Sequence, residues 1–143
     1  GRVLRGWHAD CPDAPGEFSK VEVPLDSAGA LRDAVATFAA VPVRGEALPG
    51  ATGGALSFLV PGQSQAGLAV PVTVEGRVVA VVYGDEGACD DREVPGSWPE
   101  SIQILARHAA SVLAALTARR AAARALGTLP RAPHEEGGAG GLT

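Results

Sequence analysis

The feature that most constrains the fold is the segment from Leu68 to Asp85, LAVPVTVEGRVVAVVYGD. Two apolar runs rich in β-branched residues flank Glu75-Gly76, and a two-residue turn with glycine between such runs predicts a β-hairpin. Both faces of both strands are apolar, so both faces need a cover. The segment therefore predicts the centre of an antiparallel sheet with helices or long loops on each face. Pro71 lacks a backbone N–H, which predicts a bulge or an unpaired side beside it.

The chain before the hairpin is predicted to hold two short strands. Arg2 to Ala9 and Phe18 to Leu25 both alternate apolar and polar residues, as half-buried strands do. Asp10 to Glu17 collects Asp, Pro and Gly between them, which indicates a loop.

An amphipathic helix is predicted to follow from Ala28 to Ala40. Asp26 and Ser27 are candidate N-caps, and the apolar residues recur at helical spacing. Pro42 is expected to end the helix.

The connection from Val43 to Ala66 is broken repeatedly by glycine and proline, and only Ala55 to Val60, ALSFLV, has the composition of a strand or a short helix. Long irregular connections often form binding loops, so this stretch is the expected wall of a ligand pocket.

A long C-terminal helix is predicted after a surface loop from Glu86 to Gly96. Ser97 and Glu100 form a capping-box pattern, Pro99 suits the first turn, and apolar residues continue at three-four spacing to about Leu126. Close to thirty helical residues span roughly 40 Å, more than one small sheet needs as a cover. We therefore expect a homodimer through this helix. The expected interface residues are Leu105, Ala109, Val112 and Leu116.

Composition indicates one globular domain over residues 1–126 and a flexible tail or linker over 127–143, where proline and glycine are abundant. A net charge of −4 argues against nucleic acid as a partner. No run of roughly 18 to 20 uninterrupted apolar residues and no signal peptide stands out, so we expect a soluble, cytoplasmic chain without membrane contact. The sequence contains no Met, which suggests that an upstream part is missing.

The order of these elements resembles a GAF domain. The residues that carry the resemblance are AVPVTVEGRVVAVVYGDEG from Ala69 to Gly87, SWPESIQILARHAASVLAAL from Ser97 to Leu116, and VPLDSAGALRDAVATFAAVPV from Val23 to Val43. The family's first helix and strand have no counterpart here. The resemblance implies an α+β fold: an antiparallel sheet with helices on both faces, in the manner of GAF and PAS domains, and a long C-terminal helix. It also implies sensing rather than catalysis.

A ligand pocket, if formed, is expected to be lined by large apolar side chains. The candidates are Trp7, Phe38, Phe58, Leu59 and Tyr83. The alternative is that these side chains simply fill the core. His8, His108 and His134 have no ligand partners at suitable spacing, so we expect no metal site and no cofactor.

Three functions remain open at this level. The first is a non-catalytic GAF-like regulatory module of a bacterial signalling protein, homodimeric, with a possible small-molecule ligand and a neighbouring output domain. The second is a thiol redox sensor, or an enzyme similar to the GAF-type methionine sulfoxide reductases, that uses Cys11 and Cys89. The third is a degenerate scaffold without a ligand.

Overall fold

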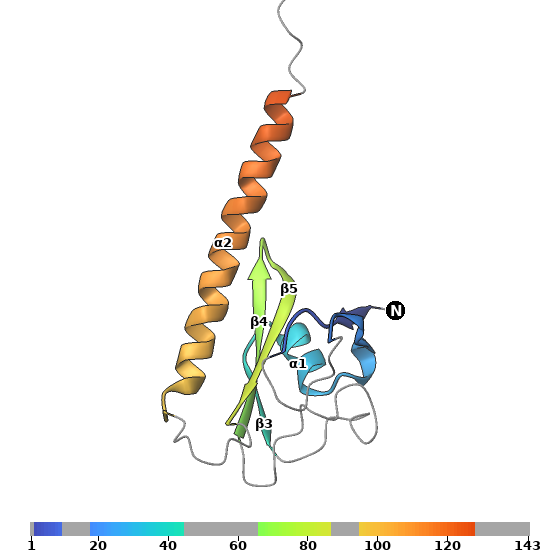
Figure 1. Ribbon diagram of the computed structural model, residues 1–143, viewed down its shortest axis with the longest axis vertical. Coiled ribbons are helices and arrows are strands. Elements are labelled where there is room, and N and C mark those ends of the chain that lie inside the picture. Colours follow the sequence, from blue (N-terminus) through green and yellow to red (C-terminus); the bar gives the residue numbers. More distant parts are fainter. Residues whose placement is uncertain (1, 10–17, 45–65, 87–94, 128–143) are drawn as a thin grey trace, which may run out of the picture.

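The computed structural model describes residues 2–9, 18–44, 66–86 and 95–127, and they form an α+β fold with two antiparallel sheets (Figure 1). The described strands are β1 (Val3–Arg5), β2 (Glu22–Pro24), β3 (Val41–Arg44), β4 (Ala66–Val74) and β5 (Arg77–Asp85). β1 pairs with β2, and the other three form a sheet in the order β3-β4-β5. The α-helices are α1 (Ala30–Thr37) and the long C-terminal helix α2 (Trp98–Gly127). The predicted fold class is confirmed.

The hairpin is formed by β4 and β5, as predicted. Glu75 and Gly76 have φ angles of 49° and 73°, and two positive φ angles are what a type I′ turn requires. The register shifts between Val72 and Thr73, which marks a bulge. Pairing of β4 with β3 stops at Ala69, so Pro71 lies beyond the last paired residue on that side. Both features suit Pro71, which cannot donate a backbone hydrogen bond to a neighbouring strand.

The two faces of β4 are covered by different helices. Leu68, Val70 and Val72 pack with Ala106 of α2, whereas Ala69 packs in a cluster with Leu31 and Ala34 of α1. Because successive side chains of a strand point to opposite faces, the apolar residues of β4 contribute to the clusters on both faces of the sheet. The prediction of a cover on both faces is confirmed for β4.

The prediction that the whole hairpin is central is wrong for β5. Among the described strands β5 lies at the sheet edge, and Val79 and Val82 are 54% and 37% exposed. Val79 is the unpaired residue of the bulge, because Val78 pairs with Thr73 and Ala80 with Val72, and α2 meets β5 at Gly84. A Cβ on Gly84 would collide with the side chain of Ile102 and contact Trp98. The helix thus covers one end of β5, while Val81 and Tyr83 of the same strand pack against the α1 cluster.

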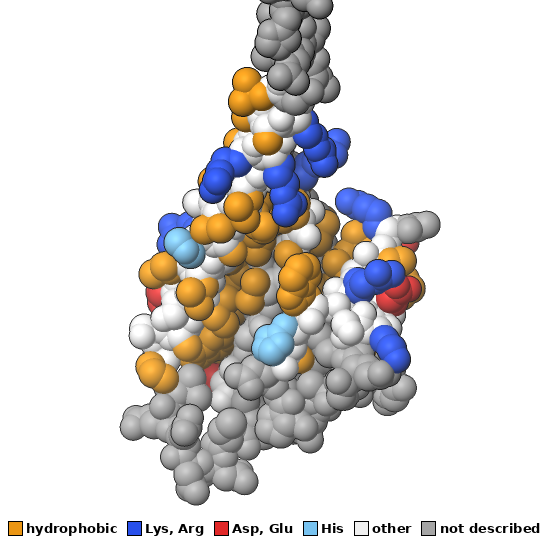
Figure 2. Space-filling model, turned by 45° about the horizontal axis from the view of Figure 1, so that its top comes forward, with side chains coloured by type: hydrophobic (Ala, Val, Ile, Leu, Met, Phe, Trp, Pro, Cys, Tyr) orange, Lys and Arg blue, Asp and Glu red, His pale blue; other side chains and the backbone are white. Residues whose placement is uncertain are grey.

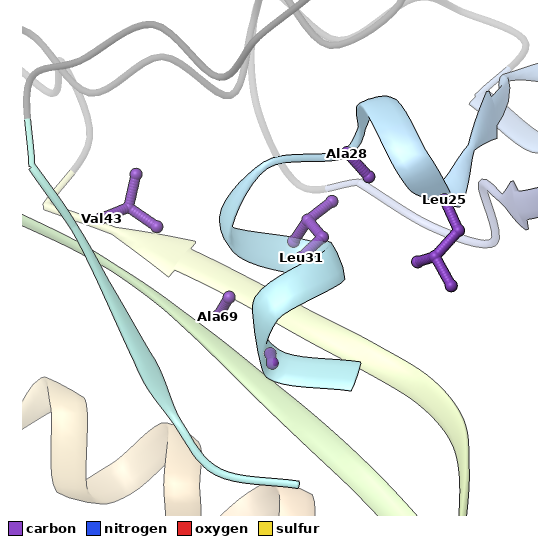
Figure 3. Packing of buried hydrophobic residues seen from close by; sticks show 6 residues of the cluster. Leu25, Ala28, Leu31, Val43 and Ala69 are labelled. Carbon is purple, nitrogen blue, oxygen red and sulfur yellow. The ribbon is translucent and has the colours of Figure 1, made fainter. Parts of the chain in front are cut away.

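The core on the α1 side joins segments that are distant in sequence. Leu31 of α1 lies among Ala28, Val43 and Ala69 (Figure 3). Leu25, from the turn that precedes α1, closes the same cluster. Burial of these side chains, at about 25 cal/mol per Å² of apolar area, holds α1 against the sheet.

The N-terminal strands are shorter than predicted. β1 has three residues rather than the eight from Arg2 to Ala9, and the predicted strand from Phe18 to Leu25 is reduced to β2 between the 3-10 helices η1 (Phe18–Lys20) and η2 (Leu25–Ser27). Burial of Leu25 turns the chain inward at the end of β2. The Ser27 hydroxyl stabilises that turn by donating to the Pro24 carbonyl at 3.0 Å.

Both predicted ends of the first helix are wrong. Asp26 and Ser27 lie in η2, and the residue before α1 is Gly29, with a φ of 52°. The helix ends at Thr37, and the next residue, Phe38, adopts the left-handed conformation. Pro42 lies inside β3, opposite Leu68. β3 is an edge strand among the described residues, and such a strand accepts proline.

α2 is confirmed as a single helix of 30 residues. Its first half covers the sheet and its second half extends beyond it (Figure 1). From Ser111 to Leu126 all side chains are exposed except that of Ala114, which is half-buried. Ala55–Val60, and every other predicted element inside residues 45–65, lie outside the described residues.

Gly67 provides the first test of this packing. A Cβ there would lie 2.8 Å from the Tyr83 hydroxyl oxygen and 3.3 Å from Val43 Cβ, so the Tyr83 ring occupies the space that a side chain would need. We expect Gly67→Ala to lower the free energy of unfolding by about 1–3 kcal/mol, the usual cost of overpacking. Urea denaturation measures this loss. Gly96→Ala is the control, because a Cβ at that position would have no neighbour within 4 Å, and it should change stability by less than about 0.5 kcal/mol. Equal losses in both variants would contradict the close packing of Tyr83 on Gly67.

Candidate functional site

A groove of about 520 Å³ lies between α2, β4 and the connection from α1 to β3. We call it the α2 groove. Its lining residues are Phe38, Ala40, Val70, Pro71, Thr73, Gln103, Ala106, Arg107, Ala110 and Ser111. The groove exists because β3 begins pairing only at Val41, opposite Ala69, so that the following part of β4 is open on this side among the described residues. A volume of this size suits a small molecule.

The polar side of the α2 groove comes from one flank of α2. Gln103 Nε2 donates to the Pro99 carbonyl at 3.3 Å, Arg107 Nε donates to the Gln103 carbonyl at 3.4 Å, and Ser111 Oγ donates to the Arg107 carbonyl at 3.1 Å. Side chains held to their own helix in this way present polar groups in fixed positions. Arg107 is the one charged residue in the described lining. The groove can therefore accommodate an apolar body with an anionic group.

Phe38 combines exposure with backbone strain at the mouth of this groove. Its φ is 57° and its ψ is 25°, its N–H donates to the Ala34 carbonyl at 3.1 Å, and its side chain is 56% exposed. The left-handed conformation disfavours a bulky residue. Neither burial nor backbone preference accounts for phenylalanine at this position, and such outliers concentrate at ligand and partner sites.

The structure does not bring the predicted pocket residues together. Trp7 lies after β1 and is 93% exposed, Phe38 borders the α2 groove, and Tyr83 packs against the α1 cluster on the opposite face of the sheet. Phe58 and Leu59 lie outside the described residues. Of Trp7, Phe38 and Tyr83, the three described members of the predicted set, Phe38 alone lines the groove. The polar residues that α2 supplies to the groove, Gln103, Arg107 and Ser111, were missed, although their spacing of four residues places them on one flank of a helix.

Tyr83 is a half-buried residue on the α1 face of β5. Its hydroxyl is inaccessible to solvent and lies near the Asp85 carboxylate. Burial, followed by the negative charge of Asp85, raises the pKa of the Tyr83 phenol well above its ordinary value. The residue thus remains neutral and serves as packing rather than as an acid or base near neutral pH.

A second candidate site is the opposite flank of α2, which carries the predicted dimer residues. Leu105, Val112 and Leu116 are 64%, 43% and 43% exposed, and Ala109 is half-buried between them. These four residues form what we call the α2 seam. They lie about 90° around the helix from Ala106, which faces the sheet. Figure 2 shows hydrophobic side chains gathered along α2 and over the adjoining part of the sheet, with arginines around the C-terminal end of α2.

α2 also has the length and composition of a membrane-spanning helix: within Trp98–Leu126 an 18-residue window has a mean hydropathy of 1.2, and it is the single such helix within the part of the chain that the structure describes. A span of about 20 residues from Trp98 would place Arg107 and His108 near the bilayer centre, where arginine costs about 2.5 kcal/mol or more. A span displaced toward the C-terminus would contain Arg119, Arg120 and Arg124 instead. Length and composition alone are weak evidence for a membrane helix.

The remaining predicted sites stay as predictions. His8 and His108 are exposed, and His134, Cys11 and Cys89 lie outside the described residues. Within the described ranges no three His, Cys, Asp or Glu side chains come together as metal ligands.

The described residues place a three-stranded antiparallel sheet between the short helix α1 and the long helix α2. Comparison with protein-family models, with curated proteins and with solved structures found no match.

Phe38 provides a test of backbone strain at the groove. Phe38→Gly removes the penalty of a positive φ, whereas Phe38→Ala removes the same ring but keeps the penalty. We expect the glycine variant to be more stable than the alanine variant by about 1 kcal/mol in urea denaturation. Equal stability of the two variants would show that the left-handed turn at Phe38 is not strained.

Tyr83 predicts a dependence of stability on alkaline pH. The folded chain keeps the phenolic proton while the unfolded chain loses it near its ordinary pKa, so the native state binds more protons and stability falls as pH rises above about 10. Urea denaturation at a series of pH values measures this slope. Tyr83 is the sole tyrosine and Lys20 the sole lysine of the sequence, so few other groups titrate there. Tyr83→Phe should flatten the slope, and an unchanged slope would exclude Tyr83 as its source.

Proposed function

We propose that this chain is a non-catalytic regulatory module of a bacterial signalling protein, GAF-like and homodimeric through α2. The observation that carries the proposal is the exposure of large apolar side chains along one flank of a 30-residue helix. A soluble monomer rarely leaves such a continuous apolar stripe in water, and three-four spacing matches association with another helix. The arginines within α2 favour a second copy over a bilayer, which supports a cytoplasmic location.

The α2 groove is the proposed ligand site of this module. It lies on one flank of α2 and the α2 seam lies on another, so both sites share one rigid element. A ligand that contacts Arg107 and Phe38 and prefers one position of α2 would change the contacts available to the seam. Such a shift of a packed helix could pass binding to a neighbouring output domain.

The dimer is tested by the double variant Leu105→Glu/Val112→Glu. Two charges in the α2 seam should convert a dimer into a monomer, because burial of unpaired carboxylates costs several kcal/mol per dimer. Light scattering coupled to size-exclusion chromatography measures the mass.

Ile104→Glu is the matched control for this experiment. Ile104 is 57% exposed, similar to Leu105, but lies about 100° further around the helix from the seam. The control should remain dimeric. A monomeric wild-type chain, or loss of the dimer in Ile104→Glu alone, would contradict the proposed role of the α2 seam.

A further inference from the structure

We infer that the α2 groove binds a small aromatic carboxylate, whose acid group pairs with Arg107 and whose ring lies against Phe38. The inference rests on the proposed function and adds the chemical class of the ligand. Three observations carry it: the single charge of Arg107, the short side chains of the groove and the exposed ring of Phe38.

Arg107 is placed to bind an anion. Its Nε atom donates to the Gln103 carbonyl at 3.4 Å, which leaves the two Nη groups at the outer end of the side chain for a ligand. The ion pairs found among the described residues do not involve Arg107, and the described lining contains no Asp or Glu that would neutralise it. Adjacent N–H groups of a guanidinium match the two oxygens of a carboxylate.

The charge of the α2 groove favours a ligand with one negative charge. Arg107 is the one charged residue in the described lining, and the other polar side chains, Thr73, Gln103 and Ser111, are neutral. A phosphate monoester carries close to two negative charges and three acceptor oxygens near neutral pH, so it would need further cations. A carboxylate carries one charge, which one guanidinium balances. The groove therefore suits a carboxylate better than a phosphate.

The apolar part of the groove favours a flat ligand body. Ala40, Ala106 and Ala110 are short, and Val70 and Pro71 of β4 complete the apolar lining. Short side chains give an even surface, and a planar ring touches such a surface over more of its atoms than a branched body does. Dispersion attraction grows with the number of these contacts.

Phe38 favours an aromatic body over an aliphatic one. Its side chain is 56% exposed and its backbone is held in the left-handed conformation, so the residue lacks the burial that usually accompanies phenylalanine. A ligand ring packed on Phe38 would remove apolar surface of both partners from water. Two aromatic rings also gain from offset or edge-to-face contact, which an alkyl chain does not offer.

The experiment is calorimetric titration of the full chain with 2-naphthoate and with 2-naphthamide, a neutral ligand of the same shape. We expect 2-naphthoate to bind at least about tenfold more tightly, because its hydrogen bonds to Arg107 join two charged groups. Octanoate keeps the carboxylate but has no ring, and 2-naphthyl phosphate adds a second charge. Both should bind more weakly than 2-naphthoate.

Two variants locate the binding in the α2 groove. Arg107→Gln should remove the preference for 2-naphthoate over 2-naphthamide, and Arg107 is exposed, so the variant should fold. Arg119→Gln is the matched control, because Arg119 belongs to the same helix but not to the described lining, and it should leave the preference unchanged. Phe38→Leu keeps an apolar side chain and should lower the affinity for 2-naphthoate by about three- to tenfold, with little effect on octanoate.

A preference for 2-naphthoate that is lost in Arg107→Gln and kept in Arg119→Gln supports the inference. Equal binding of 2-naphthoate and 2-naphthamide, binding of neither, tighter binding of octanoate or of the phosphate, or an unchanged preference in Arg107→Gln would overturn it. Light scattering on the same samples tests the proposed function separately. A dimer that does not bind 2-naphthoate would leave the homodimer standing, whereas a monomer that binds it would overturn the homodimer alone.

Discussion

The structure depends on the double burial of β4. Its side chains alternate between the α1 cluster and α2, and Leu68, Ala69, Val70 and Val72 are all buried. A strand without a polar face cannot lie at the surface, so both helices must pack on it before the sheet is stable. The hairpin turn at Glu75-Gly76, with its two positive φ angles, sets the register of that strand against β5.

One face of α2 packs on the sheet, and another face leaves large apolar side chains exposed. Where it meets the sheet it presents Ala106, Ala109 and Ala110, which let the helix approach β4 closely, together with the larger Trp98 and Ile102. The absence of a side chain at Gly84 allows the same close approach at β5. Leu105, Val112 and Leu116 lie to one side and take no part in the buried core. The helix therefore covers its sheet and still retains an apolar seam for association.

The α2 groove follows from the early end of pairing between β3 and β4. α1 stops at Thr37 and β3 starts at Val41, so the chain turns away before it can cover the adjacent part of β4. Arg107 and Gln103, each bonded to the backbone of α2, then supply polar groups beside an apolar floor that includes Val70. This combination of polar groups and an open apolar surface is the basis on which the α2 groove is proposed as a ligand site.

The sequence by itself determined the hairpin, the two-sided cover of β4 and the length of α2. These features follow from local rules: a turn that needs glycine, strict alternation along a strand and a sustained three-four repeat. Tertiary packing decided the rest. Leu25 ended β2 early because its burial in the α1 cluster outweighed strand propensity, and Pro42 entered an edge strand rather than ending a helix. Tyr83 and Phe38, equivalent as large apolar residues in the sequence, lie on opposite faces of the sheet, since the packing of the two helices, and not composition, decides which face each side chain occupies.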